Sequence, residues 1–135
     1  MATPQEITFT KMQGTGNDFL VLDNRTVQFS TNELSSFAAD WCPRRYGVGA
    51  DGLLALDSPK GKKADYRMHY VNADGSRATM CANGARCLFR FARQSGFEKN
   101  ELTFETDAGL YRATRLEESP SRVRLFVPEI TDVRT

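Results

Sequence analysis

The sequence predicts an α+β domain in which a curved, mostly antiparallel or mixed sheet wraps around one central helix. Several short runs of apolar and β-branched residues, separated by turns rich in glycine, proline and aspartate, predict the strands. A segment at 31–41 carries apolar residues at helical spacing, which predicts an early helix. A second segment at 82–95 is apolar on most of its circumference, so this helix is expected to be enclosed by the rest of the domain.

The first half of the chain is expected to form strands on either side of the early helix. Thr31 or Asn32 can cap this helix, and Pro43 ends it because proline cannot continue the hydrogen-bond ladder. Cys42 lies in the last turn and is expected to be structural. A glycine-rich loop is expected at 13–18. The strands are expected at residues 7–12, 19–23 and 53–57, with a turn at 24–28.

A further strand is expected at 65–72, where side chains alternate between two faces. One face collects four residues: Tyr66, Met68, Tyr70 and Asn72. His69, the single histidine, falls on the other face with Asp65 and Arg67. The pattern therefore predicts a solvent-facing histidine that does not act as a catalytic base.

The second half is organised around the helix at 82–95, which Gly96 is expected to cap. Cys87 comes six residues after Cys81, almost on the opposite side of the helix, so the two thiols are poorly placed to act together. A hairpin at 102–116 and a last strand at 122–127 complete the domain.

Cys81 is the candidate for chemistry because it stands at the entry of the central helix. The unpaired N–H groups and the positive end of the helix dipole favour a thiolate there, and the same N–H groups can hold a carboxylate. The plainer interpretation is that a free cysteine is a small buried hydrophobic residue. Asp51, in a glycine-rich loop, is interpreted as a loop cap in preference to a site residue.

Composition narrows the class of protein. The chain has 135 residues, and residues 1–135 are expected to form a single domain. The net charge of +1 comes without a basic stripe, so no nucleic-acid partner is expected. No apolar run is long enough for a membrane span, and the N-terminus lacks the pattern of a secretory signal. Three scattered cysteines and one histidine predict neither a disulfide framework nor a zinc site, and they fit a cytoplasmic location.

Three blocks of sequence resemble the motifs of the diaminopimelate epimerase family, in the family's order and spacing. Residues 11–19 read K-M-Q-G-T-G-N-D-F and resemble the opening motif. Residues 46–54 read Y-G-V-G-A-D-G-L-L and resemble the Gly-Asp loop. N-A-D-G-S at 72–76 and M-C-A-N-G-A-R-C at 80–87 resemble the first cysteine motif. Together the blocks span most of residues 7–112.

The resemblance implies an enzyme with two pseudo-symmetric halves and an active site in the cleft between them. This chain resembles the N-terminal half, so the C-terminal domain with the second catalytic cysteine is expected to be absent from it. The implied reaction is the conversion of LL-diaminopimelate to meso-diaminopimelate, a step of lysine and peptidoglycan-precursor synthesis, without a cofactor. The implied partner is this small amino acid, and a homodimer is a further partner that the sequence leaves open.

The resemblance also assigns roles to particular residues. Cys81 would be one of two cysteines that face each other across the α-carbon. Asn17 and Asn72 would contact the substrate through their side chains, and the backbone N–H groups of Ala82 and Asn83 would hold its α-carboxylate. No metal ligand is implied. Two positions depart from the commoner residues of the family: Gly52, where many relatives have glutamine, and Ala82, where most have glycine.

Two other functions stay open on the sequence alone. A related racemase that needs no pyridoxal phosphate would keep the chemistry and change the substrate, because the family recognises the distal end of its substrate with the missing half. A non-catalytic single-domain binding module is the other alternative, and the intact motif around Cys81 argues against it.

Overall fold

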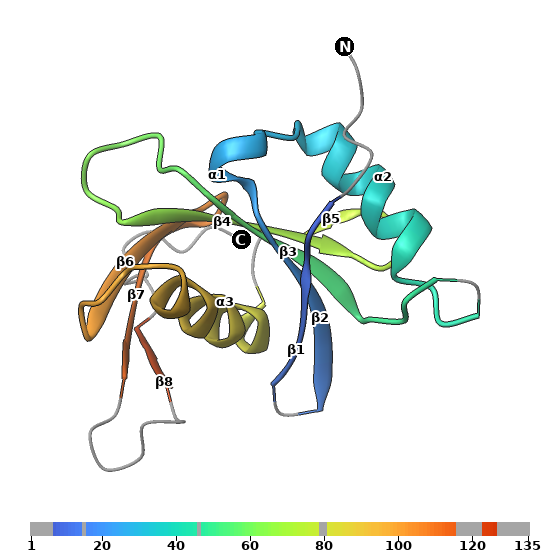
Figure 1. Ribbon diagram of the computed structural model, residues 1–135. Helices are drawn as coiled ribbons and strands as arrows, with labels where there is room; N and C mark the ends of the chain where they lie inside the picture. The colour runs from blue at the N-terminus through green and yellow to red at the C-terminus, as the bar shows by residue number, and fades with distance from the viewer. Residues whose placement is uncertain (1–6, 15, 46, 79–80, 116–122, 127–135) are drawn as a thin grey trace, which may run out of the picture.

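A computed structural model describes residues 7–14, 16–45, 47–78, 81–115 and 123–126, and within them one eight-stranded sheet curls around helix α3 (Figure 1). The elements in chain order are β1 (Thr10–Gly14), β2 (Asn17–Asp23), α1 (Asn24–Val27), α2 (Thr31–Trp41), β3 (Gly52–Asp57), β4 (Tyr66–Asn72), β5 (Arg77–Ala78), α3 (Ala82–Gln94), β6 (Glu101–Thr106), β7 (Gly109–Arg115) and β8 (Val123–Phe126).

The sheet is mixed, with strand order β1-β2-β3-β4-β6-β7-β8 and the short β5 beside β4. Two neighbouring pairs are parallel, β2 with β3 and β4 with β6, and the others are antiparallel. Parallel neighbours need a crossover connection. Helices α1 and α2 lie in the first crossover and α3 lies in the second. The predicted fold class, a curved mixed sheet around a central helix, is confirmed.

Each face of the sheet carries its own hydrophobic core. The core on the α3 side includes Phe19, Leu54 and Leu88, and the core on the α2 side includes Leu20 and Leu53. Figure 1 shows α3 in the hollow of the sheet and α1 and α2 across the other face. Strands β2 and β3 are therefore covered on both sides, which explains their continuous apolar runs.

The structure corrects several local predictions in the first half. Strand β1 begins at Thr10 rather than at residue 7, and it continues to Gly14, which pairs with Asn17 on β2. The glycine-rich loop is thus shorter than 13–18, because most of it joins the ladder. The turn expected at 24–28 contains the short helix α1.

The predicted cap of α2 is also wrong, by one or two residues. The N-cap is Ser30, whose Oγ accepts from the Glu33 N–H at 3.1 Å, while the Glu33 carboxylate accepts from the Ser30 N–H at 2.9 Å. This reciprocal capping box satisfies two backbone donors at once, and neither Thr31 nor Asn32 makes such a pair.

The prediction that His69 faces solvent is wrong. Its side chain is only 9% exposed, because α2 packs over the face of β4 that the sequence pattern marked as polar. His69 Nε2 lies 3.2 Å from an Asp57 carboxylate oxygen, which also accepts a hydrogen bond from the Asn24 amide. Burial lowers the pKa of His69, and the Asp57 carboxylate opposes that shift.

Candidate active site

Cys81 is the N-cap residue of α3, in an extended conformation with φ −141° and ψ 116°. Its sulfur accepts a hydrogen bond from the Gly84 N–H at 3.4 Å, and its carbonyl oxygen accepts from the Ala85 N–H at 2.8 Å. Cys81 is half-buried, whereas Cys42 and Cys87 are fully buried. The thiol at the helix entry is therefore the most accessible of the three.

Gly84 allows the first turn of α3 to lie close to the sheet. A Cβ at this position would lie 2.9 Å from a methyl carbon of Leu54 on β3 and 3.6 Å from the Cys81 sulfur. The glycine therefore sets how deeply the N-terminus of α3, and with it Cys81, is seated in the hollow of the sheet.

The side chains of Asn17 and Asn83 meet beside this helix entry. The Asn83 amide donates to the Asn17 side-chain oxygen at 2.7 Å, and the Asn17 amide donates to the Asp51 carboxylate at 3.1 Å. Arg86 donates to the Asn83 side-chain oxygen at 3.3 Å. The structure thus joins the start of β2, the loop before β3 and the first turn of α3 in one chain of hydrogen bonds.

An acidic pair and one arginine hold the start of β2. Asp51 accepts from the Asp18 N–H at 3.0 Å, and Asp18 accepts from the Asp51 N–H at 3.1 Å. Arg44 lies 2.7 Å from Asp18 and 3.2 Å from Asp51. The hydrogen bond from Arg44 holds the pKa of Asp18 well below its usual range, so this carboxyl is ionised at neutral pH. The Asp51 carboxylate thus bonds the backbone of β2, and it also orients the Asn17 side chain.

Asn72 lies at the end of β4, and its amide donates to Ser76 Oγ at 3.0 Å within its own turn. In the sheet, Gly52 pairs with both Phe19 and Asn72, which puts the three residues side by side on neighbouring strands. Asn72 is thus near the start of β2 but outside the hydrogen-bond chain that joins Asn17 to Asn83.

Tyr70 is a neighbour of Cys81 that the sequence did not single out. Its ring packs edge-on against Phe19, with ring centroids 6.1 Å apart, and both Tyr70 and Cys81 pack against the core around α3. Burial is the main cause that raises the pKa of Tyr70, and the negative charge of a Cys81 thiolate adds to it. The alternation along β4 predicts that Tyr70 shares a face with Tyr66. No other feature of the sequence indicates that Tyr70 lies near Cys81.

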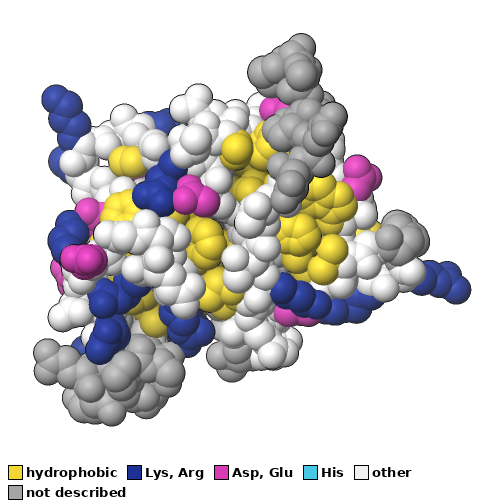
Figure 2. All heavy atoms as spheres, viewed as in Figure 1, with side chains coloured by type: hydrophobic (Ala, Val, Ile, Leu, Met, Phe, Trp, Pro, Cys, Tyr) yellow, Lys and Arg dark blue, Asp and Glu magenta, His cyan; other side chains and the backbone are white. Residues whose placement is uncertain are grey.

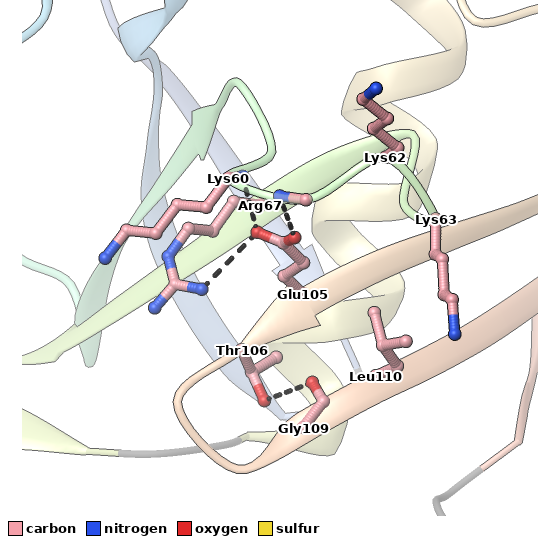
Figure 3. Close-up of a pocket in the computed structure, with 9 residues that line it drawn as sticks. Lys60, Lys62, Lys63, Arg67, Glu105, Thr106, Gly109 and Leu110 are labelled. Carbon is pink, nitrogen blue, oxygen red and sulfur yellow. Dashed lines mark hydrogen bonds and ion pairs between the residues drawn. The ribbon is translucent and has the colours of Figure 1, made fainter.

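Two pockets lie away from Cys81. One, of about 430 Å³, lies between the 60–63 loop and the β6–β7 turn (Figure 3). The Glu105 carboxylate in it already accepts from the N–H groups of Lys60 and Gly61 at 2.8 and 2.7 Å. The side chains of Lys60, Lys62 and Lys63 point in different directions, so they do not converge on a ligand.

The second pocket, of about 310 Å³, follows β1 and is lined largely by apolar side chains such as Phe9, Phe29 and Phe91. Figure 2 shows apolar side chains that reach the surface on the face carrying β1 and α3. Among the residues that the structure describes, no group of His, Cys, Asp and Glu could hold a metal ion, and no helix is long and apolar enough to cross a membrane.

The chain is similar to curated diaminopimelate epimerases over most of its length. The chain is 44% identical over 104 residues to the diaminopimelate epimerase of Flavobacterium psychrophilum, covering 77% of this chain and 40% of that protein. It is 37% identical over 134 residues to the diaminopimelate epimerase of Aquifex aeolicus, covering 94% of this chain and 48% of that protein. The chain therefore spans a little under half the length of these curated relatives.

Solved structures share the fold at low sequence identity. A methylitaconate-delta-isomerase matches with a TM-score of 0.63 and 16% identity, over 87% of this chain and 62% of that one. A probable proline racemase from Agrobacterium radiobacter matches with a TM-score of 0.61 and 17% identity, over 87% of this chain and 40% of that one. The family model described as diaminopimelate epimerase matches residues 9–125, most of the chain. On these grounds the chain belongs to the diaminopimelate epimerase family.

Proposed function

We propose that residues 1–135 form the N-terminal half of an amino-acid epimerase and carry one side of its active site. The observation that carries the proposal is Cys81, a half-buried thiol at the N-terminus of α3, inside the family's cysteine motif. The proposed reaction converts LL-diaminopimelate to meso-diaminopimelate, and the names of the relatives support this choice of substrate.

The reaction needs a base on one face of the α-carbon and an acid on the other. In one direction, a thiolate removes the α-proton, the C–H electron pair stays on carbon, and a thiol opposite delivers its proton to the other face. Cys81 is assigned to one of these two positions. Cys42 and Cys87 are unsuited to the other, because both are buried and burial raises the pKa of each thiol, that of Cys42 to about 11.

The second cysteine is therefore assigned to a C-terminal half, outside these residues. The lengths of the relatives support this division, since the chain aligns with 40% and 48% of two of them. A cleft between two halves would also exclude water from the reacting carbon, which strengthens electrostatic interactions there.

The N-terminus of α3 is proposed to bind the α-carboxylate. The first N–H groups of a helix lack acceptors within the helix, and the 13 residues of α3 add a dipole with its positive end at Ala82 and Asn83. Charge spreads onto the carboxylate as the proton leaves, so the same N–H groups stabilise the transition state more than the ground state. Asn17 and Asn72 are proposed to hydrogen-bond other polar groups of the substrate, with Asn17 oriented by Asp51.

The test joins this chain to the C-terminal half of the Flavobacterium psychrophilum relative and measures deuterium uptake from heavy water at the α-carbon of LL-diaminopimelate. Uptake with inversion is expected, with loss on Cys81→Ser and retention on Cys87→Ala. Inversion of proline in place of diaminopimelate would indicate a racemase with another substrate. A folded protein that exchanges no α-proton of any amino acid would contradict the proposal and favour a binding module.

A further inference from the structure

The first turns of α3 carry an arginine that bonds inside the domain. Arg86 follows Asn83 by three residues, so the two side chains are neighbours on the helix surface. Its Nη1 donates to the Asn83 side-chain oxygen at 3.3 Å, and its Nε donates to the Val123 carbonyl oxygen on β8 at 3.4 Å. Helix α3 contacts β8, the strand at one end of the sheet (Figure 1). The backbone of β8 therefore holds the guanidinium beside Asn83.

Asp51 stands at the opposite end of the same hydrogen-bond chain. A carboxylate oxygen can only accept, so the Asn17 side chain must present its NH₂ group there, as it does at 3.1 Å. The Asn17 oxygen then faces Asn83, which presents its own NH₂ group at 2.7 Å. The Asn83 oxygen is left facing Arg86, and a guanidinium can only donate. Every bond in this chain thus points from Arg86 towards Asp51.

The direction of the chain decides what the two amides offer to a ligand. A side-chain amide has two N–H donors and an oxygen with two lone pairs. The chain uses one donor and one lone pair of each amide, so the remaining donor and lone pair of each have a fixed direction. A 180° turn of either amide would set two oxygens or two donors against each other. The guanidinium at one end and the carboxylate at the other therefore oppose such a turn.

We propose that Arg86 is a positioning residue, which fixes the direction of the Asn83 side chain and, through it, that of Asn17. The inference deepens the proposed function and rests on it, because the direction of these amides affects turnover only where they line a substrate site. Arg86 acts through Asn83 and not by contact with the substrate, since its Nη1 and Nε are both directed at oxygens of the protein.

The first test uses the 135-residue chain, so it does not depend on turnover. Nuclear magnetic resonance measures how fast the side-chain amide protons of Asn17 and Asn83 exchange with water, and the exposed Asn32 is the internal reference. Arg86→Met keeps the aliphatic stem and removes the donor. Exchange at Asn83 should become about fivefold faster, the factor that one hydrogen bond of ordinary strength gives, and exchange at Asn17 should rise by a smaller factor. Unchanged exchange at both amides would overturn the inference.

Arg93→Met is the matched control. Arg93 also donates from α3 to backbone carbonyl oxygens, but these belong to Glu98 and Lys99 at the far end of the helix. Exchange at Asn17 and Asn83 should therefore be the same in this control as in the unchanged chain. Equal acceleration in the control and in the variant at the start of the helix would refute the inference, because the effect would then come from a general loosening of α3.

Two measurements keep the test decisive if Arg86→Met does not fold. In the unchanged chain both amides should exchange more slowly than Asn32, and equal rates would contradict the directed chain. Asn83→Ala leaves the bond between Arg86 and Val123 in place and cuts the chain in the middle. Exchange at Asn17 should become faster in Asn83→Ala, and an unchanged rate would show that Asn83 does not transmit the direction.

The second test measures kcat and KM for LL-diaminopimelate in the joined two-half protein. Arg86→Met should raise KM by about fivefold and leave kcat within about twofold, because the amides are proposed to bind the substrate and Cys81 is unchanged. A tie between α3 and β8 alone would lower stability and leave KM as it was, so an unchanged KM would overturn the inference. A joined protein that inverts no amino acid would contradict the proposed function, and the exchange rates in the 135-residue chain would still decide whether Arg86 directs the two amides.

Discussion

Gly14 on β1 and Cys87 on α3 meet at a contact that allows the role of Cys87 to be tested. A Cβ at Gly14 would lie 2.9 Å from Cys87 Sγ and 3.4 Å from the Asn83 carbonyl oxygen. Cys87 is fully buried, so its sulfur has little room to move aside. Overpacking of this kind destabilises the fold by about 1–3 kcal/mol, whereas alanine in place of a strand glycine stabilises it by about 0.5–1 kcal/mol. We expect Gly14→Ala to lower the free energy of unfolding by about 1–2 kcal/mol.

Cys87→Ala removes the sulfur and makes room for the new methyl group. Alone it should cost about 1 kcal/mol for the small cavity. Together with Gly14→Ala the loss should be smaller than the sum of the two single losses, by about 1 kcal/mol. Urea unfolding, followed by the fluorescence of the single tryptophan, Trp41, and by circular dichroism, gives all four free energies. Strict additivity would refute the argument that this sulfur fills the space beside Gly14.

Four further predictions follow from the same structure. At pH 8 Cys81 should be alkylated before Cys42, because the pKa of Cys42 is about 11 and only about one part in a thousand of its thiol is ionised. Peptide mass spectrometry identifies the modified cysteine, and modification of Cys42 first would contradict the prediction. The pKa of His69 is lowered in the fold, so His69 contributes stability above its unfolded pKa of about 6.5, and that stability is lost as the pH falls below this value. The loss of stability between pH 7 and pH 5 should therefore be smaller in His69→Gln than in the unchanged chain. An equal loss in both would contradict the lowered pKa. In the joined two-half protein, Asn72→Ala should reduce turnover and should lower the free energy of unfolding by no more than about 1 kcal/mol, because the Asn72 amide bonds to Ser76 in an exposed turn. A large fall in Tm with full turnover would indicate a structural role. The 135-residue chain alone should not invert LL-diaminopimelate, since one positioned acid or base commonly contributes about 10²- to 10⁴-fold; inversion that depends on Cys81 in this chain alone would point to two copies that share a site.

Much of the fold could be predicted because its strands and helices follow simple periodicities. The central helix was placed within one residue, since apolar positions surround it and Cys81 begins it. The wrong prediction for His69 has a physical cause. Alternation along one strand gives two faces, but it does not say that a second layer, α2, covers the polar one. The sequence does not predict strand β5, because its two residues are too few to show a periodic pattern.

The site was predictable only where it is local in sequence. The residues that follow Cys81 have a helical pattern, so the sequence alone predicts its position at the helix entry. The sequence does not predict the contact between Asn17 and Asn83, because they are 66 residues apart and only the fold brings them together. The Tyr70 ring over Gly52 likewise depends on the register of β3 and β4, which no local pattern specifies.

Asp51 shows why the distinction between a structural and a functional residue fails in this domain. One carboxylate oxygen accepts from both the Asp18 N–H and the Asn17 amide, at 3.0 and 3.1 Å, and the other faces Arg44 at 3.2 Å. The first bond closes the backbone at the start of β2, and the second orients a proposed substrate contact. Since both use the same oxygen, a change that loosens the strand also turns Asn17. The position of the Asn17 amide, a proposed substrate contact, is therefore set by the same oxygen that closes the start of β2.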